Sequence, residues 1–129
     1  MKKYLLDTHV FIWWMQDNDQ LSAKVKKLIS DPQNEIFVSS ASIWEMSIKS
    51  RLGKLKITGF SEDFLKKQII TNFFSFLPIS LEHSFGIYKL KMHHKDPFDH
   101  MLISQAQVEN CTIITKDKLF KKYDAQIAW

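Results

Sequence analysis

Four acidic side chains stand at places where the sequence changes from one apolar run to the next. Asp7 directly follows the apolar stretch Lys3–Leu6, and Asp117 closely follows another. Glu45 and Asp99 lie within segments of helical periodicity. Carboxylates without a matching basic cluster repel one another, so they hold either protons or a cation. Ligation by oxygen alone favours Mg²⁺ or Mn²⁺, ions that support phosphodiester hydrolysis by activating water.

Glu45 is the acid whose position is hardest to explain by structure alone. Most of its neighbours one and two turns away are apolar, so a helix would bury its carboxylate at a cost unless it is paired or binds a metal. Lys49, four residues on, can pair with it if its ammonium reaches back. The other acids have simple structural explanations: Asp7 as a turn residue, Asp117 as a helix N-cap and Asp99 as a favourable charge in the first turn of a helix.

The elements that must position these acids alternate between strand and helix. We expect strands at Lys3–Leu6, Ile36–Val38, Phe76–Leu77, Thr112–Thr115 and Gln126–Ala128. We expect helices at Val10–Met15, from Ser22 to Ser30, from Ser39 or Ser40 to Leu52, from Ser61 to about Asn72, from Ser80 to about Met92, from Asp96 to Asn110 and at Lys118–Tyr123. This alternation predicts an α/β fold in which helices flank a central parallel sheet of four to five strands. Ligands of such folds bind beyond the carboxyl ends of the strands, where Asp7 and Asp117 stand.

Length and composition indicate one globular domain over residues 1–129. Hydrophobic residues make up 45% of the chain, and there are only 3 Gly and 3 Pro, which excludes disorder as its main state. The single cysteine, Cys111, excludes an internal disulfide and fits a cytoplasmic location. No apolar run approaches the roughly 20 residues of a membrane span, and the charged start lacks the features of a signal peptide. The net charge of +4 permits a nucleic-acid partner without requiring one.

Four stretches of the sequence resemble the PIN-domain nucleases, in particular the VapC-type toxins of bacterial toxin–antitoxin pairs. They are Leu5–Trp14 (LLDTHVFIWW), Ser39–Glu45 (SSASIWE), Asp96–Ala106 (DPFDHMLISQA) and Ile114–Asp117 (ITKD). The resemblance implies a three-layer PIN fold and Mg²⁺- or Mn²⁺-dependent endoribonuclease activity. It assigns the metal-binding and catalytic roles to four acids, Asp7, Glu45, Asp99 and Asp117.

The same resemblance extends to substrate and partners. It implies an RNA substrate and no membrane, and it makes Thr8 or Thr115 the hydroxyl that contacts substrate. It also implies a homodimer and a short VapB-like antitoxin that blocks the site with a basic side chain. One departure is His100, at which related sequences often carry Arg. An Arg would support the acids or grip phosphate at any pH, whereas a His does so only when protonated.

Other residues could take part in a site, and structural roles are favoured for most of them. His93, His94 and His100 with Asp96 could form a metal cluster, but adjacent histidines in a loop point apart, so we expect one of the three at most to approach the site. His9 either contacts substrate or caps a short helix, and the sequence leaves both open.

Aromatic and basic residues leave similar alternatives. Tryptophans can stack on bases, but apolar helices favour core positions for Trp13, Trp14 and Trp44. Phe73, Phe74 and Phe76 read as core or as a dimer face. The densest basic stretch, at residues 49–56, is by default a solvated face and alternatively a strip that tracks RNA.

Two other functions compete with the nuclease hypothesis. A phospho-acceptor receiver domain suits the length and the acidic sheet edge, but Thr8 stands where it needs a second acid and Pro78 where it needs the acceptor. A non-catalytic RNA-binding module on the same fold would bind RNA even after loss of the acids. The four ordered acids disfavour it, since an inert protein has no need of buried charge.

Overall fold

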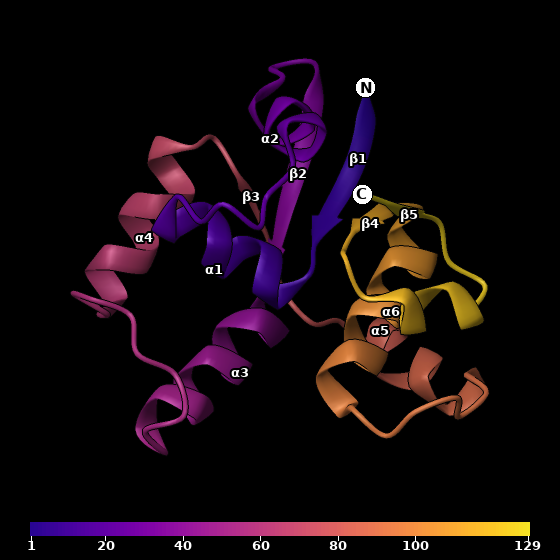
Figure 1. The fold of residues 1–129 in the computed structure, drawn as a ribbon. Coiled ribbons are helices and arrows are strands. Elements are labelled where there is room, and N and C mark those ends of the chain that lie inside the picture. Colours follow the sequence, from indigo (N-terminus) through magenta and orange to yellow (C-terminus); the bar gives the residue numbers. More distant parts are fainter.

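The computed structural model describes residues 1–129 and contains one sheet of five parallel strands. These are β1 (Lys2–Leu6), β2 (Asn34–Ser39), β3 (Ser75–Leu77), β4 (Thr112–Ile114) and β5 (Ile127–Ala128). Their order is β3-β2-β1-β4-β5, which places β1 at the centre with β2 and β4 on either side (Figure 1). The predicted α/β class and parallel sheet are confirmed.

The helices begin where local capping directs them. They are α1 (Thr8–Gln16), α2 (Ala23–Ser30), α3 (Ser40–Arg51), α4 (Glu62–Thr71), α5 (Leu81–Gly86), α6 (Pro97–Glu109) and the 3₁₀ helices η1 (Ile87–Lys89) and η2 (Lys118–Lys122). Six of them start at a side chain that accepts a hydrogen bond from a backbone N–H of the first turn, namely Ser22, Ser39, Ser61, Ser80, Asp96 and Asp117. No helix combines the length and apolar character that crossing a bilayer requires.

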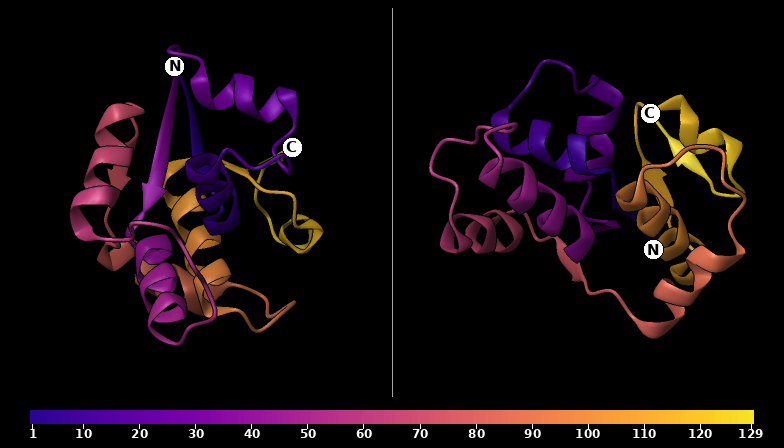
Figure 2. Two further views of the ribbon diagram at one scale, coloured as in Figure 1. Left: turned by 60° about the vertical axis from the view of Figure 1, so that its left-hand side comes forward. Right: turned by 90° about the horizontal axis from the view of Figure 1, so that it is seen from below.

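The sheet separates two apolar cores, so the molecule has three layers. Successive side chains of β1 alternate between them: Tyr4 and Leu6 join the core beneath α1, α2 and α4, whereas Leu5 joins the core beneath α6. Helix α5 packs against α6 on that second side. The turned views show helices on both sides of the sheet (Figure 2). Both faces of the strands are therefore buried, and the carboxyl edge of the sheet is left for a site.

One predicted helix is wrong in its second half. The segment expected to be helical from Ser80 to about Met92 leaves the α-helix at Gly86, passes through η1 and is extended at Leu90. Leu90 packs against the core beneath α6, and this burial outweighs the local helical periodicity. The departure matters because it frees residues 91–95 to form the turn that approaches the acids.

The predicted core position of Trp44 is also wrong. Its side chain is 58% exposed, and its ring lies edge-on to that of Phe98 at a centroid distance of 5.2 Å. Helix α3 turns Ala41, Glu45 and Met46 inward instead, which leaves Trp44 on the outer face. Trp13 and Trp14 are half-buried against the core as expected, whereas of the phenylalanines at 73, 74 and 76 only the middle one is buried.

Candidate active site

Asp7 and Asp117 meet at the carboxyl ends of β1 and β4. The Asp7 N–H donates to the carbonyl oxygen of Ile114 at 3.0 Å, which holds the two strand ends together. Between the acids lies Thr115, whose Oγ1 donates to Asp7 Oδ2 at 2.8 Å and accepts from the Asp117 N–H at 3.0 Å. The Asp117 carboxylate also caps η2 by accepting from the Leu119 N–H at 2.9 Å. One buried hydroxyl therefore fixes both acids.

Glu45 enters the site from α3 and is only 3% exposed. Lys49 Nζ donates to its Oε2 at 2.6 Å, and this bond raises the pKa of Lys49. Oε1 of Glu45 is buried and has no hydrogen-bond partner. Thr8 Oγ1 donates to Ser42 Oγ at 2.9 Å, a buried contact that fastens α1 to α3 less than one turn before Glu45. Glu45 thus has one oxygen satisfied by a cation and one unsatisfied.

Asp99 enters from the first turn of α6. Asp96 caps this helix by accepting from the N–H groups of Phe98 at 2.9 Å and Asp99 at 3.2 Å. Oδ2 of Asp99 lies 3.0 Å from His94 Nε2, and Nδ1 of the same imidazole lies 2.8 Å from the hydroxyl of Tyr123. No motif in the sequence indicates this arrangement, because it joins residues of two segments that lie 29 positions apart in the chain.

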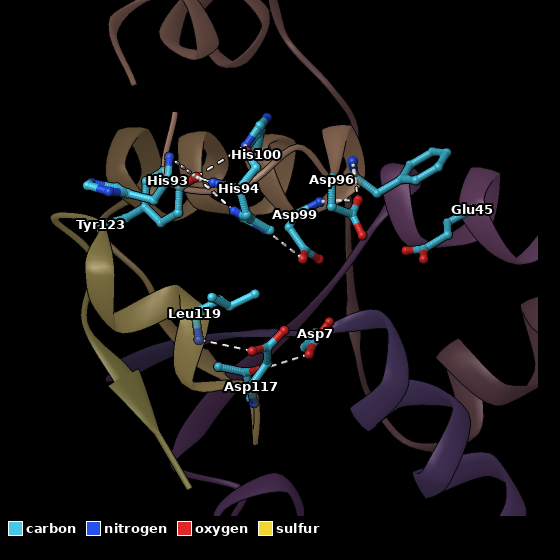
Figure 3. A network of polar contacts seen from close by, with 12 residues as sticks. Asp7, Glu45, His93, His94, Asp96, Asp99, His100, Asp117, Leu119 and Tyr123 are labelled. Carbon is cyan, nitrogen blue, oxygen red and sulfur yellow. Dashed lines mark hydrogen bonds and ion pairs between the residues drawn. The ribbon is translucent and has the colours of Figure 1, made fainter. Parts of the chain in front are cut away.

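The four predicted acids are gathered in one place, with their carboxylates turned toward a common space (Figure 3). Burial raises the pKa of Asp7, and the negative charge of Glu45 raises it further. The pKa of Asp99 rises to about 8, first because burial removes water and then because of the neighbouring negative charges on Asp96, Asp7, Glu45 and Asp117. The charges of the other three acids all act on Asp99, so the four carboxylates form one negative site.

The donor chemistry of this site fits a hard divalent cation. All the donors are carboxylate oxygens, one of which is buried without a partner, and their mutual repulsion is the kind of cost that a cation relieves. No three His, Cys, Asp or Glu side chains stand close enough to enclose one ion. The donor atoms are therefore of the type that binds a divalent cation, and the acidic side chains have to move closer together to bind one.

A groove of about 380 Å³ adjoins the acids between α1 and α3. Its walls include Thr8 and Glu45 from the site itself and two lysines, Lys49 and Lys54. His9 and Trp13 of α1 also line it, with their ring centroids 6.0 Å apart, and the rest of the lining is Ile12, Gln16, Met46 and Leu55. The groove thus combines positive charge and aromatic faces next to a negative site.

The histidines near α6 do not form a metal cluster. His100 is buried, its Nε2 lies 2.7 Å from the carbonyl oxygen of His94, and it faces Tyr123 rather than the acids. His93 packs its ring edge-on against Tyr123. Only His94 contacts one of the predicted acids, in agreement with the expectation that at most one of the three reaches the site.

A model of the PIN domain family matches residues 4–126, nearly the entire chain. The chain belongs to the PIN-domain family. The resemblance found in the sequence is confirmed, and the receiver-domain alternative is rejected. No curated protein is similar enough in sequence to this PIN domain to count as a match.

Solved structures share the fold of this PIN domain at low sequence identity. VapBC2 from Rickettsia felis, bound to a DNA fragment from its promoter, is 19% identical with a TM-score of 0.70 over 98% of each chain. DNA-bound VapBC from Salmonella typhimurium is 14% identical with a TM-score of 0.74, over 99% of this chain and 98% of that one. VapBC-1 from nontypeable Haemophilus influenzae is 20% identical with a TM-score of 0.67, over 98% of this chain and 96% of that one. At such identities the likeness concerns the fold alone.

Proposed function

We propose that this PIN domain is a VapC-type endoribonuclease that hydrolyses RNA with the help of Mg²⁺ or Mn²⁺, and that residues 1–129 act as one nuclease domain. The observation that carries the proposal is the meeting of Asp7, Glu45, Asp99 and Asp117 at the carboxyl edge of a PIN sheet, with Glu45 Oε1 buried and unpartnered. These four side chains would hold the ion. When bound, it would polarise the scissile phosphate and orient the attacking water.

The residues of the chain prepare the site for that chemistry. Thr115 keeps Asp7 and Asp117 in place, and Thr8 joins α1 to α3 while lining the groove in which substrate would lie. A cluster of carboxylates repels a phosphodiester, so substrate can approach only after a cation offsets this charge. The acids therefore define where the cleaved phosphate is placed, and they require a cation there.

The groove between α1 and α3 supports single-stranded RNA as the substrate. Lys54 supplies a positive charge for backbone phosphates, and His9 and Trp13 offer rings on which bases can stack. Positive charge and stacking rings favour no particular base, which agrees with recognition of RNA by shape and loop structure. Substrate would thus enter along α1 and present its phosphate at the acids.

Two exposed apolar surfaces support protein partners. One is the outer stripe of α3 beside Glu45, formed by Trp44, Ile48 and Leu52. We assign it to a short VapB-like antitoxin, because a basic side chain of such a partner could then reach the acids much as Lys49 does. One of the similar structures belongs to the VapBC family of toxin–antitoxin systems. The second surface is formed by the exposed side chains Leu81, Phe85 and Tyr88 of α5 and η1, and it would join two copies in a homodimer. We place the pair in the cytoplasm with its RNA substrate.

Cleavage of purified RNA tests the proposed function. Wild-type protein is expected to cut RNA in Mg²⁺ or Mn²⁺ and to lose this activity in excess EDTA. Asp7→Asn should abolish cleavage, whereas Asp19→Asn, which removes an exposed acid between α1 and α2, should not. Equal cleavage by the Asp7 variant or in EDTA would refute the proposal. RNA binding without cleavage would instead support the non-catalytic alternative.

A further inference from the structure

A chain of hydrogen bonds connects Asp99 to the buried end of η2 (Figure 3). Asp99 Oδ2 is 3.0 Å from His94 Nε2, and His94 Nδ1 is 2.8 Å from the Tyr123 hydroxyl. The imidazole therefore stands between a carboxylate and a phenol, with both ring nitrogens engaged. Its side chain is only 12% exposed, so water does not readily replace either contact.

The neighbours of the Tyr123 hydroxyl determine the direction of these bonds. Backbone N–H groups of His93 and His94 donate to this oxygen at 3.2 and 3.3 Å, and such groups can only donate. The hydroxyl hydrogen is then available to His94 Nδ1. With Nδ1 accepting, Nε2 carries the ring hydrogen and donates it to Asp99. His94 is thus oriented to donate a hydrogen bond to the carboxylate of Asp99.

The anchor of this chain is rigid and belongs to the acid site. Tyr123 is buried at the end of η2, and η2 begins at its cap Asp117. On the other side, His100 Nε2 donates to the carbonyl oxygen of His94 and fastens the turn to α6. Asp117 and Asp99 therefore face the same site and are also linked to each other through Tyr123 and His94.

We propose that His94 and Tyr123 are positioning residues for Asp99, which hold Oδ2 and leave Oδ1 to a divalent cation. The inference rests on the metal-binding role proposed above for the acids. Oδ1 makes no hydrogen bond within the chain, whereas Oδ2 is occupied by His94. Groups that orient a metal-binding carboxylate are worth about 10- to 100-fold in metal affinity or activity. His94 and Tyr123 touch neither substrate nor ion in this role, and they act only through Asp99.

Two amide substitutions of His94 separate positioning from packing. The amide nitrogen of Gln can take the place of Nε2 and reach Asp99, whereas that of Asn corresponds to Nδ1 and cannot. His94→Asn should therefore weaken Mn²⁺ binding, measured by calorimetry, by about 10- to 100-fold, and His94→Gln should retain most of the affinity. In RNA cleavage, His94→Asn should raise the Mn²⁺ concentration for half-maximal rate, and saturating Mn²⁺ should restore most of the rate.

Tyr123→Phe removes only the hydroxyl oxygen and is a second test of the positioning role. It should weaken Mn²⁺ binding in the same direction by a smaller factor, and adding it to His94→Asn should cause no further loss. His93→Asn is the matched control, because His93 is exposed and packs against the Tyr123 ring without contacting an acid. That control should bind Mn²⁺ and cleave RNA like wild type.

The outcomes distinguish this inference from the proposed function. A folded His94→Asn protein with wild-type Mn²⁺ affinity, or an equal loss in His93→Asn, would overturn the positioning role. If His94→Asn does not fold, Tyr123→Phe decides by the same affinity measurement. Wild-type protein that binds Mn²⁺ but leaves RNA intact would refute the nuclease, and the Mn²⁺ arm would still decide the positioning role.

Discussion

Glu45 and Asp99 face the same site, but the molecule holds them in opposite ways. Glu45 on α3 is paired with Lys49, whose side chain is 39% exposed and comes from one turn further along the same helix. Asp99 on α6 is held by His94, which is 12% exposed and is itself fixed by a buried tyrosine. One acid is paired with a partly exposed ammonium, and the other is oriented by a largely buried imidazole ring.

The difference shows that charge and geometry are managed separately in this site. An ammonium on a long stem offsets charge but imposes little direction, so Glu45 can exchange it for another cation. An imidazole with both nitrogens engaged imposes direction but offsets no charge while it is neutral. No cation therefore offsets the charge of Asp99, and burial, together with the neighbouring negative charges, raises its pKa to about 8.

The largest effect should be a loss of RNA cleavage when either Glu45 or Asp99 is replaced. Glu45→Gln and Asp99→Asn should each reduce RNA cleavage by about 10²- to 10³-fold, since each removes one preorganised charge from the reacting centre. Rates measured at saturating RNA and fixed Mn²⁺ would show it. A near-normal rate in only one variant would mean that the two acids do not serve the same centre.

The same two substitutions should have opposite effects on stability. The folded-state pKa of Asp99 is raised from 3.8 to about 8, so its contribution to stability is present below about pH 4 and is lost as the pH rises toward 8. Relative to Asp99→Asn, wild type in EDTA should lose at most about 1.4 kcal/mol per pH unit over this range. Glu45→Gln should be less stable than wild type at pH 8, because it leaves Lys49 without its partner. Parallel curves of unfolding free energy against pH for wild type and Asp99→Asn would contradict the first expectation.

Lys49→Met tests the ion pair between Lys49 and Glu45 separately from the contacts of Asp99. It leaves a buried carboxylate unpaired, and we expect a loss of about 1–3 kcal/mol in unfolding free energy, less than for a fully buried pair because Lys49 is partly exposed. Added Mn²⁺ should then raise the Tm of the variant more than that of wild type, since the ion replaces the missing charge. An equal rise in both proteins would show that Lys49 and the ion do not share Glu45.

The smallest effect concerns substrate beside Glu45. Lys54→Ala should weaken binding of a single-stranded RNA to the inactive Asp7→Asn protein and lower the slope of log affinity against log salt by about 1. Fluorescence anisotropy at several salt concentrations measures both quantities. Lys24→Ala on α2, which also removes an exposed lysine, is the matched control. Equal losses in both variants would place the RNA on a general positive surface rather than in the groove.

Much of the fold was predictable because its signals are local. Ser22, Ser61 and Asp96 cap helices within the next three residues, so the sequence placed these helix starts correctly. The end of α5 and the outward position of Trp44 were not predictable, since both depend on what the other helices leave uncovered. The periodicity of a segment describes that helix or strand alone, whereas the burial of a side chain depends on how several elements pack together.

In the candidate site, too, local features were predictable from the sequence and contacts between distant segments were not. The sequence by itself determined the four acids and their places after strands or within helices, and it also indicated Lys49, because a partner four residues away on a helix is set by helical geometry alone. Only the tertiary structure decided that Thr115 holds Asp7 across 108 residues and that Tyr123 holds His94 across 29. Such contacts depend on which strand ends and turns become neighbours, and no spacing within a single segment encodes that.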